Sequence, residues 1–108
     1  MTDRFPCPYL QGEVELAERR EGHIAEKHPG LLPEHRPRIA ETLADPDEVR
    51  RSVRFGDARL FARWYDEVGG GKHVVVVVVS EAGAGRHWII TAYMARKLSG
   101  GQVEWRKS

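Results

Sequence analysis

Six consecutive valines at residues 74–79 constrain the fold of this chain more than any other feature. β-Branched side chains favour extended backbone, and a run of this length is typical of one strand. Because the run leaves no polar side for water, the strand is predicted to lie inside a sheet with both faces covered. The cover of the second face is either the same chain or a second copy, which would form a homodimer.

Further strands are predicted around the valine strand, because β-rich segments alternate with glycine-containing turns. The predicted strands cover residues 51–55, 58–65, 73–80, 86–93 and 102–106, with a short extended piece at 13–16. The connecting segments are of hairpin length, which predicts antiparallel neighbours.

Two helices are predicted before these strands. The first, residues 18–27, ends before Pro29 and Gly30. The second begins at Pro33 or Pro37 and ends at Ala44, because the residue that follows Ala44 precedes a proline. Residues 1–12 contain two prolines and are predicted to form an irregular lead.

The chain has 108 residues, the size of a single domain, so residues 1–108 are predicted to share one core. The predicted fold class is α+β, with two N-terminal helices packed on one face of a four- to five-stranded antiparallel sheet. The single cysteine, Cys7, cannot form a disulfide framework and is typical of a reducing compartment. With no stretch of ~20 apolar residues and no secretory signal, a cytoplasmic protein without membrane association is predicted.

The two halves of the chain differ in charge although the net charge is only +1. Residues 1–48 contain 6 Lys or Arg and 11 Asp or Glu, whereas residues 49–108 contain 11 and 5. The basic second half is suited to an anionic partner such as nucleic acid. Charge alone equally allows the two halves to neutralise each other in the folded domain.

Alternation along the predicted strand 58–65 separates two kinds of side chain. Leu60, Ala62 and Trp64 form an apolar set, which is predicted to face the core. The other set interleaves guanidinium groups with aromatic rings: Arg59, Phe61, Arg63 and Tyr65. Guanidinium groups match phosphate geometry and rings stack on bases, so this set is suited to nucleic acid, although an ordinary solvated face is the alternative.

His23 is the histidine best placed for proton transfer, because His28 shares a helix face with Ile24 and is better explained as a half-buried capping residue. Five residues place the two imidazoles about 140° apart around a helix, which disfavours a metal pair, so no metal site is predicted. No phosphate-binding loop, dinucleotide fingerprint or nucleophile elbow is visible, and no cofactor is predicted. Thr91 and Tyr93 end an apolar strand, either at a site or simply in solvent.

Several short motifs occur in an order that is similar to one nuclease superfamily. They are Val14-Glu15-Leu16, His23-Ile24, Lys27-His28-Pro29, the segment from Glu41 to Ser52, Phe61 to Tyr65, the valine strand, Ile89 to Tyr93 and Gly101 to Trp105. Together they resemble the phage-associated branch of the barnase–EndoU–colicin–RelE-like nucleases over residues 13–106.

The resemblance implies a metal-independent, toxin-like or phage-derived ribonuclease that cleaves RNA by attack of the 2′-hydroxyl on the adjacent phosphate. It also implies a possible cognate inhibitor protein as a partner. The catalytic residues it implies are His23 as acid or base, Arg63 as the cation, and Tyr65, Thr91 and Tyr93. The substrate-binding residues are His28 and Ser52, with Arg59 and Phe61 added by the strand alternation.

Two other functions are open from the sequence alone. One is a non-catalytic module of the same fold that binds nucleic acid or protein. The other is an interaction protein that dimerises through its valine strand.

Overall fold

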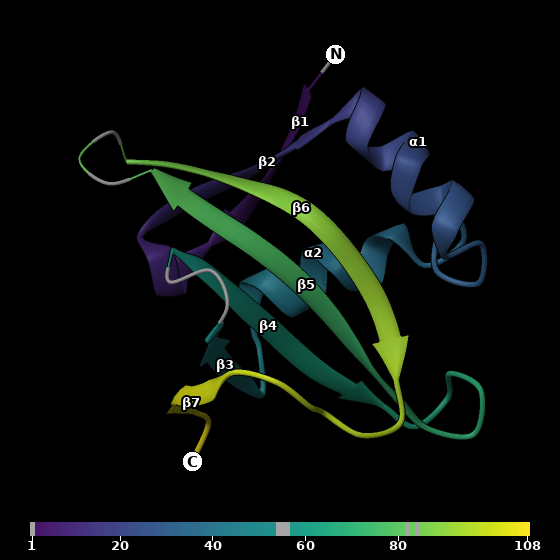
Figure 1. Ribbon diagram of the computed structural model, residues 1–108. Helices are drawn as coiled ribbons and strands as arrows, with labels where there is room; N and C mark the ends of the chain where they lie inside the picture. The colour runs from purple at the N-terminus through teal and green to yellow at the C-terminus, as the bar shows by residue number, and fades with distance from the viewer. Residues whose placement is uncertain (1, 54–56, 82, 84) are drawn as a thin grey trace.

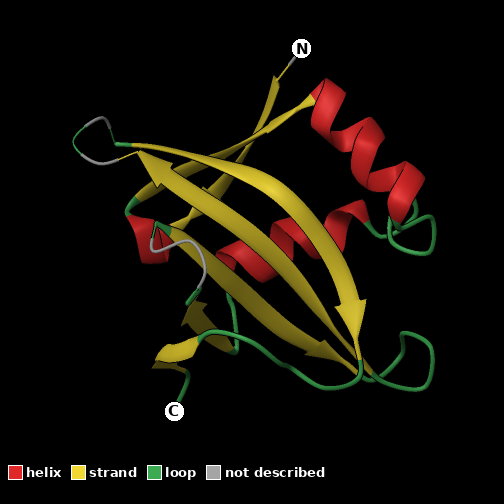
Figure 2. Ribbon diagram, viewed as in Figure 1, coloured by secondary structure: helices red, strands yellow, loops and turns green. Residues whose placement is uncertain are grey.

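The computed structural model describes residues 2–53, 57–81, 83 and 85–108, and in them seven strands form one mixed sheet flanked by two helices (Figures 1 and 2). The strands are β1 Thr2–Cys7, β2 Gly12–Ala17, β3 Glu48–Arg51, β4 Ala58–Tyr65, β5 Lys72–Glu81, β6 Arg86–Ala95 and β7 Gln102–Arg106. The helices are α1 Glu18–Lys27 and α2 Arg36–Ala44, and a 3-10 turn, η1 Pro8–Leu10, joins β1 to β2. The spatial strand order is β1-β2-β6-β5-β4-β3-β7.

The predicted fold class is wrong. The described sheet has seven strands rather than four or five, β2 pairs with β6 in parallel, and a hairpin precedes both helices. The lead predicted as irregular forms β1 and η1, because Phe5 and Cys7 are buried and alternate with exposed Arg4 and Pro6. Pro6 is tolerated in β1 because an edge strand does not need every backbone donor.

Most of the other predicted elements are confirmed. The first helix and the strands 58–65 and 102–106 have the predicted bounds, and β5 and β6 extend slightly beyond theirs. The helix α2 begins at Arg36, between the two predicted starts. The strand predicted at 51–55 is wrong, because β3 covers 48–51 instead, where buried Val49 pairs with Phe61; residues 54 and 55 lie outside the described part of the chain.

The valine strand has one fully covered face and one partly covered face. The even-numbered valines of β5 are 0% exposed and pack in one core with Ile39 and Leu43 of α2, which passes behind β5 in Figure 1. We call this the helix-covered face of the sheet. On the second face Val75 is buried, but Val77 and Val79 are only half-buried. The predicted cover of both faces is therefore correct only for the first.

The alternation along β4 is confirmed, but its assignment to the core is reversed. Phe61 is 0% and Tyr65 5% exposed on the helix-covered face, whereas Trp64 is 40% exposed on the second face. The reason is the register, which places Phe61 beside Val76 and the valine face that α2 covers. The guanidinium groups of Arg59 and Arg63 reach acidic partners at the rim of this face, so their charges stay paired.

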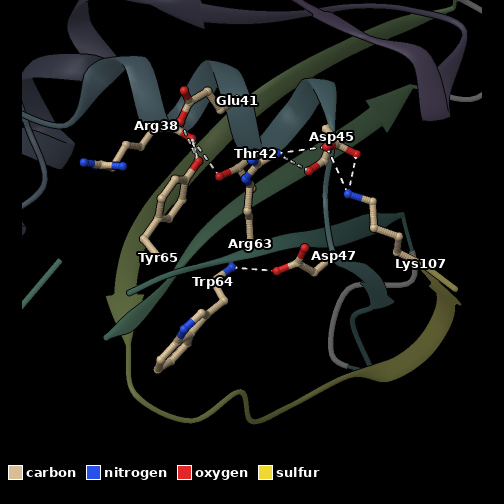
Figure 3. A network of polar contacts seen from close by, with 9 residues as sticks. All are labelled: Arg38, Glu41, Thr42, Asp45, Asp47, Arg63, Trp64, Tyr65 and Lys107. Carbon is tan, nitrogen blue, oxygen red and sulfur yellow. Dashed lines mark hydrogen bonds and ion pairs between the residues drawn. The ribbon is translucent and has the colours of Figure 1, made fainter. Parts of the chain in front are cut away.

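Polar contacts with Tyr65 fix α2 on β4 (Figure 3). The Tyr65 hydroxyl donates to Oε1 of Glu41 at 2.9 Å and lies 3.3 Å from the carbonyl oxygen of Arg38. The Arg38 guanidinium stands 4.6 Å from the centre of the Tyr65 ring. The ring therefore contributes both apolar burial and polar contacts to the docking of α2.

A second set of contacts holds the C-terminal end of α2. Nη1 of Arg63 donates to the Asp45 carbonyl at 3.0 Å and to its carboxylate at 3.1 Å, and Nζ of Lys107 lies 2.9 Å from the same carboxylate. A hydrogen bond from Lys107, reinforced by Arg63, holds the pKa of Asp45 below its ordinary value. Cations at a helix C-terminus are favourable because the helix dipole is negative there.

Replacement of Tyr65 by Phe tests the docking of α2. The variant keeps the buried ring and loses the hydroxyl contacts, so we expect the free energy of unfolding to fall by ~1 kcal/mol in urea denaturation. Tyr93→Phe is the matched control on the second face, because the Tyr93 hydroxyl has no hydrogen-bond partner among the described residues. Equal losses in both variants would contradict this role of Tyr65.

A glycine pair between β4 and β5 gives a second stability test. Gly71 has φ +105°, and a Cβ atom there would lie 2.5 Å from Cζ2 of Trp64, whereas Gly70 has φ +78° with open space around it. Gly70→Ala should cost ~1–2 kcal/mol from backbone strain, and Gly71→Ala ~1–3 kcal/mol more from the clash with the ring. Thermal denaturation measures both, and equal melting temperatures would show that the Trp64 ring is not fixed by Gly71.

Candidate active site

His23 lies apart from the other residues predicted for catalysis. It is exposed on α1 and lines an open concavity of about 730 Å³ together with Arg19, Arg20, Gly22 and Glu26. Among the described residues that line this concavity, none belongs to the sheet strands that carry the other predicted catalytic residues. The structure therefore does not bring His23 together with them.

The sheet separates the remaining predicted catalytic residues. Arg63 and Tyr65 lie 5.6 Å apart, guanidinium carbon to ring centre, on the helix-covered face, where both are engaged with α2. Thr91 and Tyr93 lie on the second face, paired with Val77 and Val75 respectively. The predicted set is thus divided between two faces, and its catalytic roles stay predictions.

The residues predicted for substrate binding also lie in different places. His28 ends α1, with its ring centre 6.2 Å from that of Tyr93. Phe61 is fully buried, so it has no surface on which a base could stack. The backbone N–H of Ser52 donates to the carbonyl of Ala58 at 2.9 Å where β3 leaves the sheet. Arg59 alone among them belongs to a charged cluster with exposed surface.

That cluster is centred on Glu104 of β7, which accepts hydrogen bonds from three other elements. Nε of Arg51 in β3 donates to Oε1 at 2.8 Å, and Nε of Arg59 in β4 donates to Oε2 at 2.8 Å. The hydroxyl of Tyr9 in η1 donates to Oε2 at 2.5 Å. We call these four residues the Glu104 cluster. It lies where the adjacent strands β4, β3 and β7 meet the N-terminal hairpin.

A β-bulge aims Glu104 at its partners. The register between β3 and β7 shifts so that Val103 pairs with Arg50 and Trp105 with Val49, which leaves Glu104 as the extra residue. Tyr9 contacts both Glu104 and the Trp105 ring, so these two successive residues face the same side. Bulges of this kind redirect side chains and are frequent beside active sites.

The Glu104 carboxyl is charged and its neighbours are donors. Burial raises its pKa, but the hydrogen bonds from Tyr9, Arg59 and Arg51 outweigh burial, so the pKa lies below its ordinary value of 4.5. Burial and the bond to Glu104 raise the pKa of Tyr9 to about 12, so the phenol keeps its proton. The cluster therefore carries one net positive charge at neutral pH and has the donors that a phosphate requires.

His87 is linked to the cluster through Arg59. Its Nδ1 lies 2.7 Å from Oγ of Ser80 on the neighbouring strand. Burial, followed by the positive charge of Arg59, lowers the pKa of His87 below its ordinary value of 6.5. The register is consistent with this effect: Arg59 pairs with Val78 and His87 pairs with Ser80, two residues further along β5, so the two side chains share one face of the sheet. Together these groups can bind an anion, accept a proton and donate one.

Sequence reasoning missed Glu104, Tyr9 and His87 as members of a site. One signal for Glu104 was available: it is the only acidic residue after Glu81, in a segment otherwise rich in Lys and Arg. The sequence carries no such signal for Tyr9, because the prolines around it predict an irregular segment. Only the fold shows that η1 lies against β7.

Within the described ranges, no group of three or more His, Cys, Asp or Glu side chains is close enough to hold a metal ion. No helix formed by these residues is both long and apolar enough to cross a bilayer.

Comparison with models of known protein families finds no match. Searches among curated proteins and among solved structures also return no match. No relative therefore bears on the resemblance to the barnase–EndoU–colicin–RelE-like nucleases.

Proposed function

We propose that the protein is a metal-independent endoribonuclease whose active site is the Glu104 cluster. One observation carries the proposal: a partly buried carboxylate is held between two guanidinium groups and a phenol, with the His87 imidazole on the same face of the sheet as Arg59. This set contains a base, a phosphate-binding pair and a proton donor, which are the groups that cleavage by an internal hydroxyl requires.

Glu104 is the proposed general base. Its carboxylate accepts the proton of the ribose 2′-hydroxyl while that oxygen forms a bond to the adjacent phosphorus. Nε of Arg51 and Nε of Arg59 each lie 2.8 Å from this carboxylate, so a phosphate bound beside Glu104 is within reach of both guanidinium groups. Their fixed positive charges stabilise the additional negative charge of the phosphorane.

His87 is the proposed general acid. When a phosphate anion binds at Arg59, the nearby negative charge raises the pKa of the imidazole and favours its protonated form. The protonated ring then donates to the leaving 5′-oxygen as the phosphorus–oxygen bond breaks. The products are a 2′,3′-cyclic phosphate and a free 5′-hydroxyl, so DNA, which has no 2′-hydroxyl, is not a substrate.

Glu104→Gln and His23→Ala distinguish this site from the one implied by resemblance. Gln keeps the size and loses the basicity of Glu104, so we expect the cleavage rate of bulk RNA in EDTA to fall about 10²–10⁴-fold. His23→Ala, on the distant face of α1, should leave the rate unchanged. Circular dichroism is the control that checks whether both variants fold. Loss of activity in His23→Ala but not in Glu104→Gln would overturn the assignment.

The pH dependence of kcat/KM gives an independent test. Glu104 acts as a base at pH values above its pKa, which is lower than 4.5. His87 acts as an acid at pH values below its pKa, which is lower than 6.5. The product of these fractions is greatest on the acidic side, so we expect a bell-shaped profile with its maximum below pH 6.5. His87→Gln should remove the alkaline limb, and a maximum above pH 7.5 would contradict the assignment of the acid.

A non-catalytic module of the same fold is the competing function. In that case wild-type protein binds RNA without cleaving it, and binding weakens steeply with salt because phosphates are contacted. If RNA incubated with wild-type protein in EDTA stays intact at pH 4.5–7.5, and binding is salt-sensitive, the protein is this binding module and not an enzyme.

A further inference from the structure

Three aromatic rings form a continuous path from the core to the surface beside Glu104. The ring of Phe61, fully buried, meets the edge of the Tyr9 ring at 5.8 Å between centres and an angle of 85°. Tyr9 in turn meets Trp105 at 5.8 Å and 56°. Each ring is therefore positioned by the one beneath it, and the outermost, Trp105, remains 38% exposed.

The position of Trp105 relative to Glu104 is fixed by the same residue. Tyr9 holds the Glu104 carboxylate through its hydroxyl and the Trp105 ring through its own ring. The exposed indole thus lies on the same side of β7 as Arg51 and Arg59, which donate to that carboxylate. An exposed large ring held beside a phosphate-binding pair combines backbone and base recognition, the pattern that proteins use for unpaired nucleic acid.

We infer that Trp105 is a nucleobase-stacking subsite that restricts the substrate to single-stranded RNA. This inference rests on the proposed function and adds its substrate class. A base stacks on the indole only when it is unpaired and free of its own neighbour, because a duplex buries both faces of every base. An unpaired base on Trp105 directs the phosphate next to it toward Arg51 and Arg59, so the ring positions the scissile bond.

A protein ligand fits this surface less well. Val103 is 44% exposed nearby, but it pairs with β3 on the far side of the bulge from Trp105. The bulge also disrupts the outer edge of β7, which disfavours the addition of a partner strand. In the part of the chain that the structure describes, the exposed ring held beside the Glu104 cluster is that of Trp105, and a single ring suits one base.

The test uses an oligonucleotide that cannot be cleaved, so that binding is measured without catalysis. A single-stranded 2′-O-methyl RNA of mixed sequence is titrated into wild-type protein and into Trp105→Ala and Trp105→Phe variants, and tryptophan fluorescence and Kd are recorded. We expect wild-type fluorescence to be quenched, Trp105→Ala to bind at least about fivefold more weakly, and Trp105→Phe to recover part of the affinity. The same oligonucleotide annealed to its complement should bind Trp105→Ala and wild type equally.

Trp64→Phe is the matched control, because Trp64 is 40% exposed but lies on the second face of the sheet. Trp64→Phe should keep wild-type affinity. Unchanged affinity and unchanged quenching in Trp105→Ala would overturn the subsite, even where Glu104→Gln still abolishes cleavage and so supports the active site. Conversely, RNA left intact by wild-type protein, together with weakened binding in Trp105→Ala, would overturn the enzyme proposal and leave a single-strand binding surface.

Discussion

Burial of the even-numbered valine face against α2 is the interaction on which the other features depend. β5 pairs along most of its length with β4 and β6, so the face that α2 covers on β5 is also the face covered on both neighbours. Because α2 covers this face, Phe61 and Tyr65 point into the core and Trp64 points away from it. The same packing also sends the two guanidinium groups of β4 to the rim of this face, where that of Arg63 meets Asp45 and that of Arg59 meets Glu104.

The charges of the two halves of the chain largely neutralise each other in the fold. Arg63 and Lys107 meet Asp45, and Arg86 meets Glu15, so basic groups of the second half pair with acidic groups of the first. The uneven charge along the sequence is therefore mostly a folding device. Glu104 differs, because it belongs to the basic half and draws its guanidinium partners from that half. This difference distinguishes the proposed anion site from the structural ion pairs.

The sequence predicted local structure better than it predicted the sheet or the site. Alternation and glycine turns identified β4, β5 and β7 because these signals act between near neighbours. They could not show that residues 2–7 add a strand, since the prolines there argue against one until the edge position is known. Glu104 and Tyr9 are 95 positions apart, and only the tertiary fold places them in contact. Arg59 was found from its strand, but its acidic partner was not.

The parallel contact between β2 and β6 has a consequence for this site. In the described chain it consists of one register pair, Glu15 with Trp88, whereas β1 and β2 pair along their whole length. The N-terminal hairpin is thus tied to the main sheet by few backbone bonds, and its attachment depends on buried side chains, Phe5, Val14 and Leu16 among them. Because Tyr9 belongs to this hairpin, its detachment would expose the Glu104 carboxylate and release the indole that the phenol ring supports. The packing of the N-terminal hairpin and the arrangement of the Glu104 cluster are therefore coupled through Tyr9.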